Sequence, residues 1–142
     1  MSDPETNIKI SHGLLDAWSN KTPDVLDEVC GPEWTDHDPA FPFKDLRGPD
    51  AAKAALALYE VAFPDLNVII EDAFSAEDKV CTRWIFEGTQ TGDLPDLPAT
   101  GRPFSVKGIT VDRIEDGKLA ESWSMWDVST FAQQLGIAPP VE

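Results

Sequence analysis

The spacing of apolar residues changes near Phe63, and this change divides the chain into two parts with different secondary structure. Before Phe63, apolar side chains recur every three or four positions, as in residues 8–20, which is the period of an amphipathic helix. After it, apolar and polar residues alternate through residues 67–75 and 79–92, which is the period of a half-buried strand. Helices followed by long antiparallel strands are typical of the α+β class, so the pattern predicts an α+β fold.

Residues typical of helix ends, turns and loops set the expected boundaries of the secondary-structure elements. Helices are predicted over residues 8–20, 22–30 and 48–63, with Thr22 as the N-cap of the second. A short last helix is predicted from Ser129, as its N-cap, to Gly136, where it stops. Residues 33–48, which include two prolines, are predicted to be irregular, residues 93–103 to be a loop and residues 104–126 to be a hairpin.

Length and charge restrict the class of protein. The 142 residues form one predicted domain, residues 1–142, which is long enough to bury a core. A net charge of −15 argues against nucleic acid and anionic membranes as partners, because phosphates would be repelled. The two cysteines, Cys30 and Cys81, give neither a disulfide framework nor a metal cluster, so no metal is expected. The N-terminus has no signal-peptide pattern, and the cytoplasm is the expected location.

The predicted hairpin raises a question of register at Asp116-Gly117. A two-residue turn would pair Thr110 with Trp123, whereas a three-residue loop would pair Thr110 with Ser122. The three-residue loop separates the two faces better and is the preferred interpretation. One face is then small and polar and leaves room for a pocket: Gly108, Thr110, Asp112, Ala120, Ser122, Ser124 and Trp126.

The opposite face of this hairpin is bulky and largely apolar. It carries Ile109, Val111, Trp123 and Met125. A monomer would leave these side chains partly exposed, so the pattern predicts a homodimer or a higher homo-oligomer.

The chain resembles the SnoaL-like polyketide cyclases, also called ester cyclases, best from Phe63 to Gly136. The motifs that carry the resemblance are G-T-x-T-G at 88–92, P-x-T-G-R at 98–102, R-I-x-D-G-K at 113–118 and the terminal Q-L-G at 134–136. The resemblance implies the nuclear-transport-factor-two-like fold, a cone-shaped curved antiparallel sheet wrapped by N-terminal helices around a deep pocket. It also implies aldol ring closure on a polyketide ester without any cofactor.

The family's catalytic residues do not carry over to this sequence. The resemblance implies a His-x-Asp pair on the last strand, where this chain has Ser122 and Ser124, and a histidine at Thr110. The histidine frequent in G-T-H-T-G is Gln90 here, which can hydrogen-bond a carbonyl but cannot transfer protons near neutral pH. The pocket itself does carry over, with Trp18 and Ala55 at positions that line it in the family.

Among the remaining titratable side chains, His37 is the best candidate for acid–base chemistry. His37 lies between Asp36 and Asp38, which would favour its protonated form, so His37 with Asp38 or Asp36 is the predicted acid–base group. Asp127 is a further catalytic candidate, although capping the last helix is the preferred interpretation for it. His12 is expected at the edge of the core.

Two functions of different classes stay open. The first is cofactor-free acid–base chemistry on a small apolar or polycyclic carbonyl compound, by a cyclase or by a related isomerase or hydroxylase. The second is a binding module with the same cavity and no chemistry. In both, the ligand is small and apolar or aromatic, and the predicted contacts are Trp18, Ala55, Trp84, Phe86, Gln90, Thr110, Ser122, Ser124 and Trp126.

Overall fold

The computed structural model describes residues 3–38, 41, 43 and 45–137, and the expected breaks at Pro39 and Pro42 lie outside them. The elements follow one another as α1 (Pro4–Asn20), α2 (Pro23–Val29), β1 (Cys30–Asp36), α3 (Gly48–Ala62), β2 (Asn67–Ala76), β3 (Lys79–Thr89), β4 (Pro103–Glu115), β5 (Lys118–Trp126) and α4 (Val128–Gln134). The α+β prediction is therefore confirmed. None of the helices in these residues is both long and apolar enough to cross a membrane.

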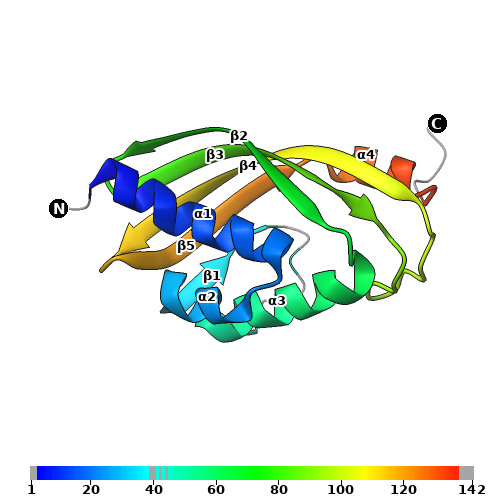
Figure 1. Cartoon of the computed structure of the whole chain (residues 1–142), viewed down its shortest axis with the longest axis horizontal. Coiled ribbons are helices and arrows are strands. Elements are labelled where there is room, and N and C mark those ends of the chain that lie inside the picture. The colour runs from blue at the N-terminus through cyan, green and yellow to red at the C-terminus, as the bar shows by residue number, and fades with distance from the viewer. Residues whose placement is uncertain (1–2, 39–40, 42, 44, 138–142) are drawn as a thin grey trace.

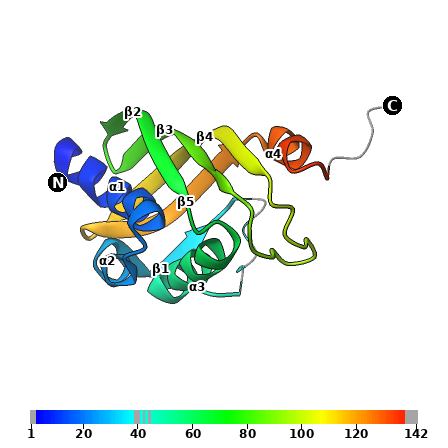
Figure 2. The ribbon, with the colours of Figure 1, turned by 45° about the vertical axis from the view of Figure 1, so that its right-hand side comes forward.

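The five strands form one curved sheet in the order β1-β5-β4-β3-β2. Helices α1, α2 and α3 lie on one side of this sheet, and α4 lies at its far end, next to β4 (Figures 1 and 2). The core lies between the sheet and the three helices, and the fully buried side chains of Leu26, Trp34 and Leu119 are part of it. Among the described residues, no helix covers the opposite face of β2–β5.

The first strand was not expected, because residues 33–36 were predicted to be irregular. β1 pairs in parallel with β5, so the sheet is mixed and not purely antiparallel. Gly31 and Pro32 lower the strand signal of this segment, and proline is tolerated in a sheet mainly on edge strands. β1 is an edge strand, which is why its sequence does not show the pattern of a central one.

Helix caps explain two further differences in the boundaries. α1 begins four residues earlier than expected, because Asp3 accepts a hydrogen bond from the backbone N of Thr6 at 3.0 Å and Pro4 takes the first helical position. α4 is capped by Asp127, whose carboxylate accepts from the backbone N of Thr130 at 3.0 Å. Ser129 is therefore not the N-cap, whereas the capping role preferred for Asp127 is confirmed.

The β4–β5 hairpin corrects the expected register and explains why the predicted faces are nevertheless right for the residues beyond Ala120. Glu115 pairs with Lys118 around a two-residue turn, so the three-residue loop is wrong. Beyond the turn, Ile114 pairs with Leu119 and Arg113 pairs with Glu121, which leaves Ala120 as an extra residue. This bulge shifts the strand by one position, so Thr110 lies opposite Ser124. Two one-residue differences cancel in parity, so Ser122, Ser124 and Trp126 return to their expected face, whereas Ala120, expected on the same face, is the extra residue of the bulge.

The turn gives a direct test of this hairpin. Asp116 and Gly117 have φ values of 53° and 75°, as a two-residue turn of the mirror-image type requires. A Cβ at Gly117 would meet no atom within 4 Å, so only backbone conformation opposes a larger residue there. We expect Gly117→Ala to lower the free energy of unfolding by about 1 kcal/mol. Urea unfolding measures this loss.

Asp116→Asn is the matched control for this variant. Asparagine tolerates the left-handed region, so we expect its unfolding midpoint to stay at the wild-type value. A Gly117→Ala protein as stable as wild type would contradict the turn assignment.

Candidate active site

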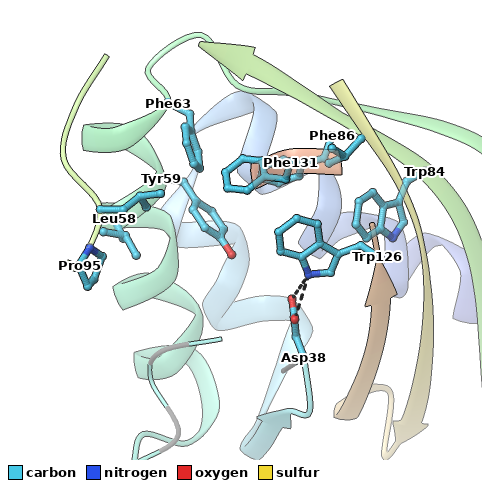
Figure 3. A pocket seen from close by; sticks show the side chains of 11 residues that line it. Asp38, Leu58, Tyr59, Phe63, Trp84, Phe86, Pro95, Trp126 and Phe131 are labelled. Atoms are coloured by element: carbon cyan, nitrogen blue, oxygen red, sulfur yellow. Dashed lines mark hydrogen bonds between the residues drawn. The ribbon is translucent and has the colours of Figure 1, made fainter. Parts of the chain in front are cut away.

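A cavity of about 330 Å³ lies between α3, the inner face of the sheet and α4 (Figure 3). This volume is in the range of small-molecule sites. Its wall is formed mostly by large apolar side chains from elements that are far apart in the sequence. The residues that line it are Asp38, Leu58, Tyr59, Phe63, Trp84, Phe86, Leu94, Pro95, Val106, Trp126 and Phe131.

Aromatic rings dominate the sheet side of this cavity. Trp84 and Phe86 lie two positions apart on β3, so both point to the same inner face, with ring centroids 6.1 Å apart. Trp126 ends β5 and packs edge-on against Phe131 of α4 at 5.4 Å. The structure thus places three of the predicted ligand contacts, Trp84, Phe86 and Trp126, on the cavity wall. Aromatic walls suit a flat ligand.

Asp38 supplies the carboxylate of this wall. The indole Nε1 of Trp126 donates to both of its oxygens, at 3.0 and 3.1 Å, and so holds the carboxylate in place (Figure 3). The Tyr59 hydroxyl points from α3 toward the same part of the cavity. Burial, with the carboxylates of Asp36 and Asp38, raises the pKa of Tyr59, so the phenol stays protonated as a hydrogen-bond donor. A base and a donor therefore lie together in an otherwise apolar space.

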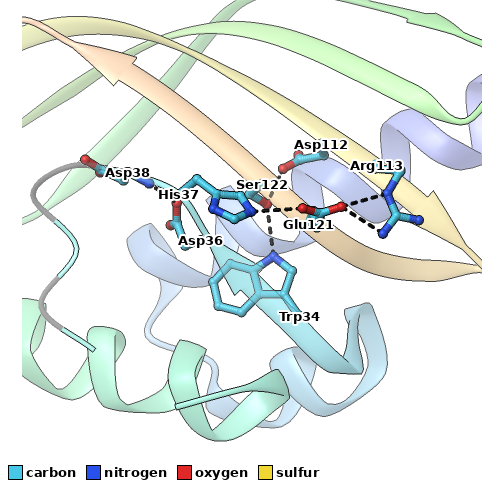
Figure 4. A network of polar contacts seen from close by, with 8 residues as sticks. All are labelled: Trp34, Asp36, His37, Asp38, Asp112, Arg113, Glu121 and Ser122. Atoms are coloured by element: carbon cyan, nitrogen blue, oxygen red, sulfur yellow. Dashed lines mark hydrogen bonds and ion pairs between the residues drawn. The ribbon is translucent and has the colours of Figure 1, made fainter. Parts of the chain in front are cut away.

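His37 and Asp38 were expected to act together, and the structure separates them. The ring of His37 stacks on Trp123 with centroids 5.4 Å apart. Its Nε2 lies 2.9 Å from a Glu121 oxygen (Figure 4). Its side chain is 45% exposed and is not among those that line the cavity. Asp36 accepts a hydrogen bond from the backbone N of Asp38 at 2.9 Å. Consecutive residues after a strand point to opposite sides, so only one of this pair reaches the cavity.

The space expected above Ser122 is occupied by Trp34 of β1. The Trp34 indole donates to the Ser122 hydroxyl at 2.9 Å, and Ser122 in turn donates to Asp112 (Figure 4). Ser11 of α1 donates to the other Asp112 oxygen. Both Trp34 and Asp112 are almost completely buried. The chain thus has a buried carboxylate that the sequence analysis did not single out, although Asp112 was on the small polar face.

The remaining predicted contacts lie behind the cavity wall. Thr110 accepts the Trp84 indole N–H at 2.8 Å and hydrogen-bonds Ser124 at 3.0 Å, so these hydroxyls support the wall from behind. Trp18 packs edge-on against Tyr59 at 5.3 Å. Gln90 is completely buried and bonds the 97–100 segment. Besides Thr110, five expected contacts are therefore not among the residues that line the cavity: Trp18, Ala55, Gln90, Ser122 and Ser124.

On α3 the cavity begins one turn after the expected position. Ala55 is fully buried in the core, and Leu58 and Tyr59 line the cavity three and four residues later. Residues three and four positions apart share one face of a helix, so the sequence could have indicated Leu58 and Tyr59 once Ala55 was placed near the cavity.

Two other titratable candidates also lie outside the cavity. Asp127 is on the helix cap, beside an open hollow on the outer face of the sheet. His12 approaches Thr82 with its Nε2 at 3.3 Å, and burial lowers the pKa of His12 despite the nearby Asp16 carboxylate. Its expected place at the core edge is confirmed.

Comparisons with known proteins show which family the chain is similar to. Residues 9–135 match the family model described as SnoaL-like polyketide cyclase. Aklanonic acid methyl ester cyclase DnrD of Streptomyces peucetius is 31% identical over 137 residues, which cover 92% of this chain and 91% of the relative. DauD, an aklanonic acid methyl ester cyclase of Streptomyces sp. strain C5, is 31% identical over 135 residues, which cover 91% and 81%.

Solved structures show the same similarity. TsrD from Streptomyces laurentii superposes with a TM-score of 0.86 at 31% identity, over 96% of this chain and 99% of its own. Wild-type IdmH of Streptomyces antibioticus superposes with a TM-score of 0.77 at 26% identity, over 92% of this chain and 98% of its own.

The buried carboxylate predicts an unusual dependence of stability on pH. Burial raises the pKa of Asp112 from 3.8 to about 6, against the opposite effect of the hydrogen bonds from Ser11 and Ser122. The native state then binds this proton more tightly than the unfolded state, so stability falls as pH rises from 3.8 through about 6. Because asparagine cannot ionise, we expect Asp112→Asn to gain up to about 3 kcal/mol relative to wild type across this window. Urea unfolding at several pH values measures the difference.

Asp127→Asn is a control of opposite sign. Hydrogen bonds from Thr130 lower the pKa of Asp127, so its contribution to stability is present above the unfolded pKa and is lost as pH falls. We therefore expect this variant to lose stability relative to wild type as pH rises. Parallel pH profiles for wild type and Asp112→Asn would show that Asp112 does not titrate in this window.

Proposed function

This chain belongs to the SnoaL-like polyketide cyclase family, and we propose that it catalyses an aldol-type ring closure of a polycyclic carbonyl compound with Asp38 as its acid–base group. The resemblance drawn from the sequence motifs is thereby confirmed at the level of the family. One observation carries the proposal: an aromatic cavity contains a carboxylate held by an indole N–H, with a phenol pointing toward it.

The proposed reaction needs one base that takes a proton and later returns it. Asp38 removes a proton from a carbon next to a carbonyl group, and the Tyr59 hydroxyl donates a hydrogen bond to the resulting enolate oxygen. The enolate carbon attacks a second carbonyl carbon of the same molecule, forming a carbon–carbon bond and an alkoxide. The alkoxide takes the proton back from Asp38. The product is an isomer of the substrate, so the steps consume no oxidant or reductant.

Position favours Asp38 over His37 in this role. A general base must come within hydrogen-bond reach of the proton that it removes. The cavity wall includes Asp38, whereas His37 is stacked on Trp123 outside it. The role predicted for His37 therefore becomes the alternative that the experiment has to exclude.

Substitution of Asp38 tests the proposal. The compound to try first is aklanonic acid methyl ester, because the two relatives are named as its cyclases. Two readouts apply: exchange of the acidic proton in deuterated water, followed by mass spectrometry, and formation of the cyclised isomer, followed by chromatography. Loss of a general base typically costs about 10²–10⁴ in rate, and we expect Asp38→Asn to lower both rates by this factor.

His37→Gln is the matched control, and we expect it to keep both rates near wild type. The reverse pattern, with loss in His37→Gln and retention in Asp38→Asn, would assign the base to His37. A wild-type protein that binds the ester but exchanges no proton would favour the binding module, and activity equal to wild type in both variants would refute an acid–base role for either residue.

The uncovered face of the sheet supports a second proposal, that the active protein is a homodimer. Large apolar side chains are exposed on the face of β2–β5 opposite the helices: Ile69, Phe74, Ile109, Trp123 and Met125. Charges of both signs, including those of Glu71, Arg83 and Lys107, lie near them. A second copy of the chain presents the same apolar side chains with charges of both signs beside them. Two such faces can therefore pack against each other, with opposite charges meeting around the apolar contact.

Met125→Glu tests the dimer. Met125 is 72% exposed on this face, so a charge there leaves the monomer intact but must be desolvated in a dimer. We expect wild type to sediment as a dimer at micromolar concentration and Met125→Glu as a monomer. Val61→Glu is the control, because Val61 is 63% exposed on α3, away from this face. Monomeric wild-type protein would rule the dimer out.

A further inference from the structure

Gln90 is buried at the end of β3, and both ends of its amide bind one loop. Its Oε1 accepts from the backbone N of Thr100 at 3.1 Å and from the Thr100 hydroxyl at 2.8 Å. Its Nε2 donates to the carbonyl oxygens of Leu97 and Pro98, at 3.4 Å each. A glutamine amide offers two donor hydrogens and two acceptor sites, so these bonds use its full capacity. The direct contact with a ligand carbonyl that the sequence suggested for Gln90 would have to break one of them.

The loop that Gln90 holds, residues 93–101, is also fixed at its two ends. The backbone N–H groups of Thr91 and Gly92 donate to the Ala62 carbonyl at the end of α3, at 3.1 and 3.2 Å. A Cβ on Gly92 would lie 1.8 Å from the Val61 carbonyl oxygen, so only glycine allows this approach. At the other end, the backbone N of Gly101 donates to the Gln90 carbonyl at 2.8 Å.

Within the loop, a tight turn carries two side chains into the cavity wall. Leu94 and Leu97 exchange backbone hydrogen bonds of 2.9 and 3.0 Å across Pro95 and Asp96. Asp93 accepts from the backbone N of Ala99 at 2.8 Å. Leu94 and Pro95 then line the cavity, and Pro95 lies beside Leu58, across the cavity from Trp84 (Figure 3).

The cavity therefore has a polar part and an apolar part that are built by different elements. Asp38 and the Tyr59 hydroxyl come from the segment after β1 and from α3. Leu94 and Pro95 come from the loop, and no side chain of residues 93–101 binds Asp38 or Tyr59 among the hydrogen bonds of the described residues. A change in the loop can alter which ligand fits while leaving the reacting groups in place.

We propose that Gln90 is a positioning residue for substrate selection: it fixes Leu94 and Pro95 as the apolar wall that receives the non-reacting end of a flat, polycyclic substrate. This inference rests on the proposed function for the orientation of the substrate, with its reacting carbonyl groups at Asp38. Gln90 acts through the loop and does not touch the ligand. Pre-ordering a loop in its bound conformation increases affinity, because the cost of ordering it is not incurred on binding.

The expected signature is a loss of affinity that depends on ligand length. A ligand long enough to span from Trp84 to the loop loses its contacts with Leu94 and Pro95 when the loop is released. A shorter ligand that occupies only the part near Trp84 and Asp38 does not. The rate of proton exchange at saturating ligand stays near wild type, because the loop does not hold the base.

Binding of two matched ligands tests this inference. A two-ring naphthoquinone and a three-ring anthraquinone, each carrying the same methyl ester, are titrated by quenching of the tryptophan fluorescence of Trp84 and Trp126, which line the cavity. We expect Gln90→Ala to weaken the anthraquinone on the order of tenfold, the usual effect of a few lost apolar contacts in a pocket, and the naphthoquinone less than about twofold. Thr100→Val removes one of the same bonds from the loop side and should give a smaller loss of the same selectivity.

Gln133→Ala is the control, because Gln133 is an exposed glutamine on α4 and has no contact with this loop among the hydrogen bonds of the described residues. Equal weakening of both ligands would mean that Gln90 only stabilises the fold, and would overturn the inference. Unchanged affinity for both in Gln90→Ala would overturn it too. The binding measurement is independent of turnover, so a failure of the acid–base proposal, seen in Asp38→Asn, is distinguished from a failure here.

Discussion

The hydrogen bond from the buried Trp34 indole to Ser122 joins β1 to β5, and the placement of the candidate site depends on that junction. The backbone adds to it, because the N–H of His37 donates to the Ser122 carbonyl at 2.8 Å. With β1 held in this register, the next residue, Asp38, reaches the cavity and the Trp126 indole. A one-residue shift of β1 would exchange His37 and Asp38, and the cavity would then contain an imidazole in place of a carboxylate.

The carboxylate of Asp112 makes this junction both specific and costly. Its two oxygens accept hydrogen bonds from Ser11 of α1 and Ser122 of β5, so one side chain ties a helix to the sheet below Trp34. Burial of a carboxylate is unfavourable unless hydrogen bonds offset its desolvation, and the raised pKa of Asp112 shows that they do so only in part. The network therefore favours one arrangement of β1, α1 and β5 more than it adds to net stability.

The sequence predicted those elements in which one period of apolar residues dominates. It failed where a single extra residue or a side-chain hydrogen bond determines the structure. The change of period after Phe63 was enough for the α+β class, and alternation on β3 was enough to put Trp84 and Phe86 on one face of the strand, which lines the cavity in the structure. The extra residue Ala120 was missed, because a three-residue loop gives the residues beyond it the same parity as a two-residue turn followed by a bulge. Strand β1 was missed because its Gly31 and Pro32 are typical of loops, and without β1 nothing indicated that Trp34 would occupy the space above Ser122.

The same junction explains how a member of this family can lack the expected acid on its last strand. The resemblance places the family's His-x-Asp pair at Ser122 and Ser124, and in this chain those hydroxyls bind Asp112 and Thr110 inside the structure. Ser122 also receives the Trp34 indole, so the position holds the strand that ends just before Asp38. Under the proposed function, the acid–base group lies in the segment after β1, and the position of the family's catalytic pair supports that strand. The proposed acid–base group and the loop proposed to select the substrate are then held by separate hydrogen bonds, those between Trp126 and Asp38 and those between Gln90 and the loop. One of the two can therefore change without the other.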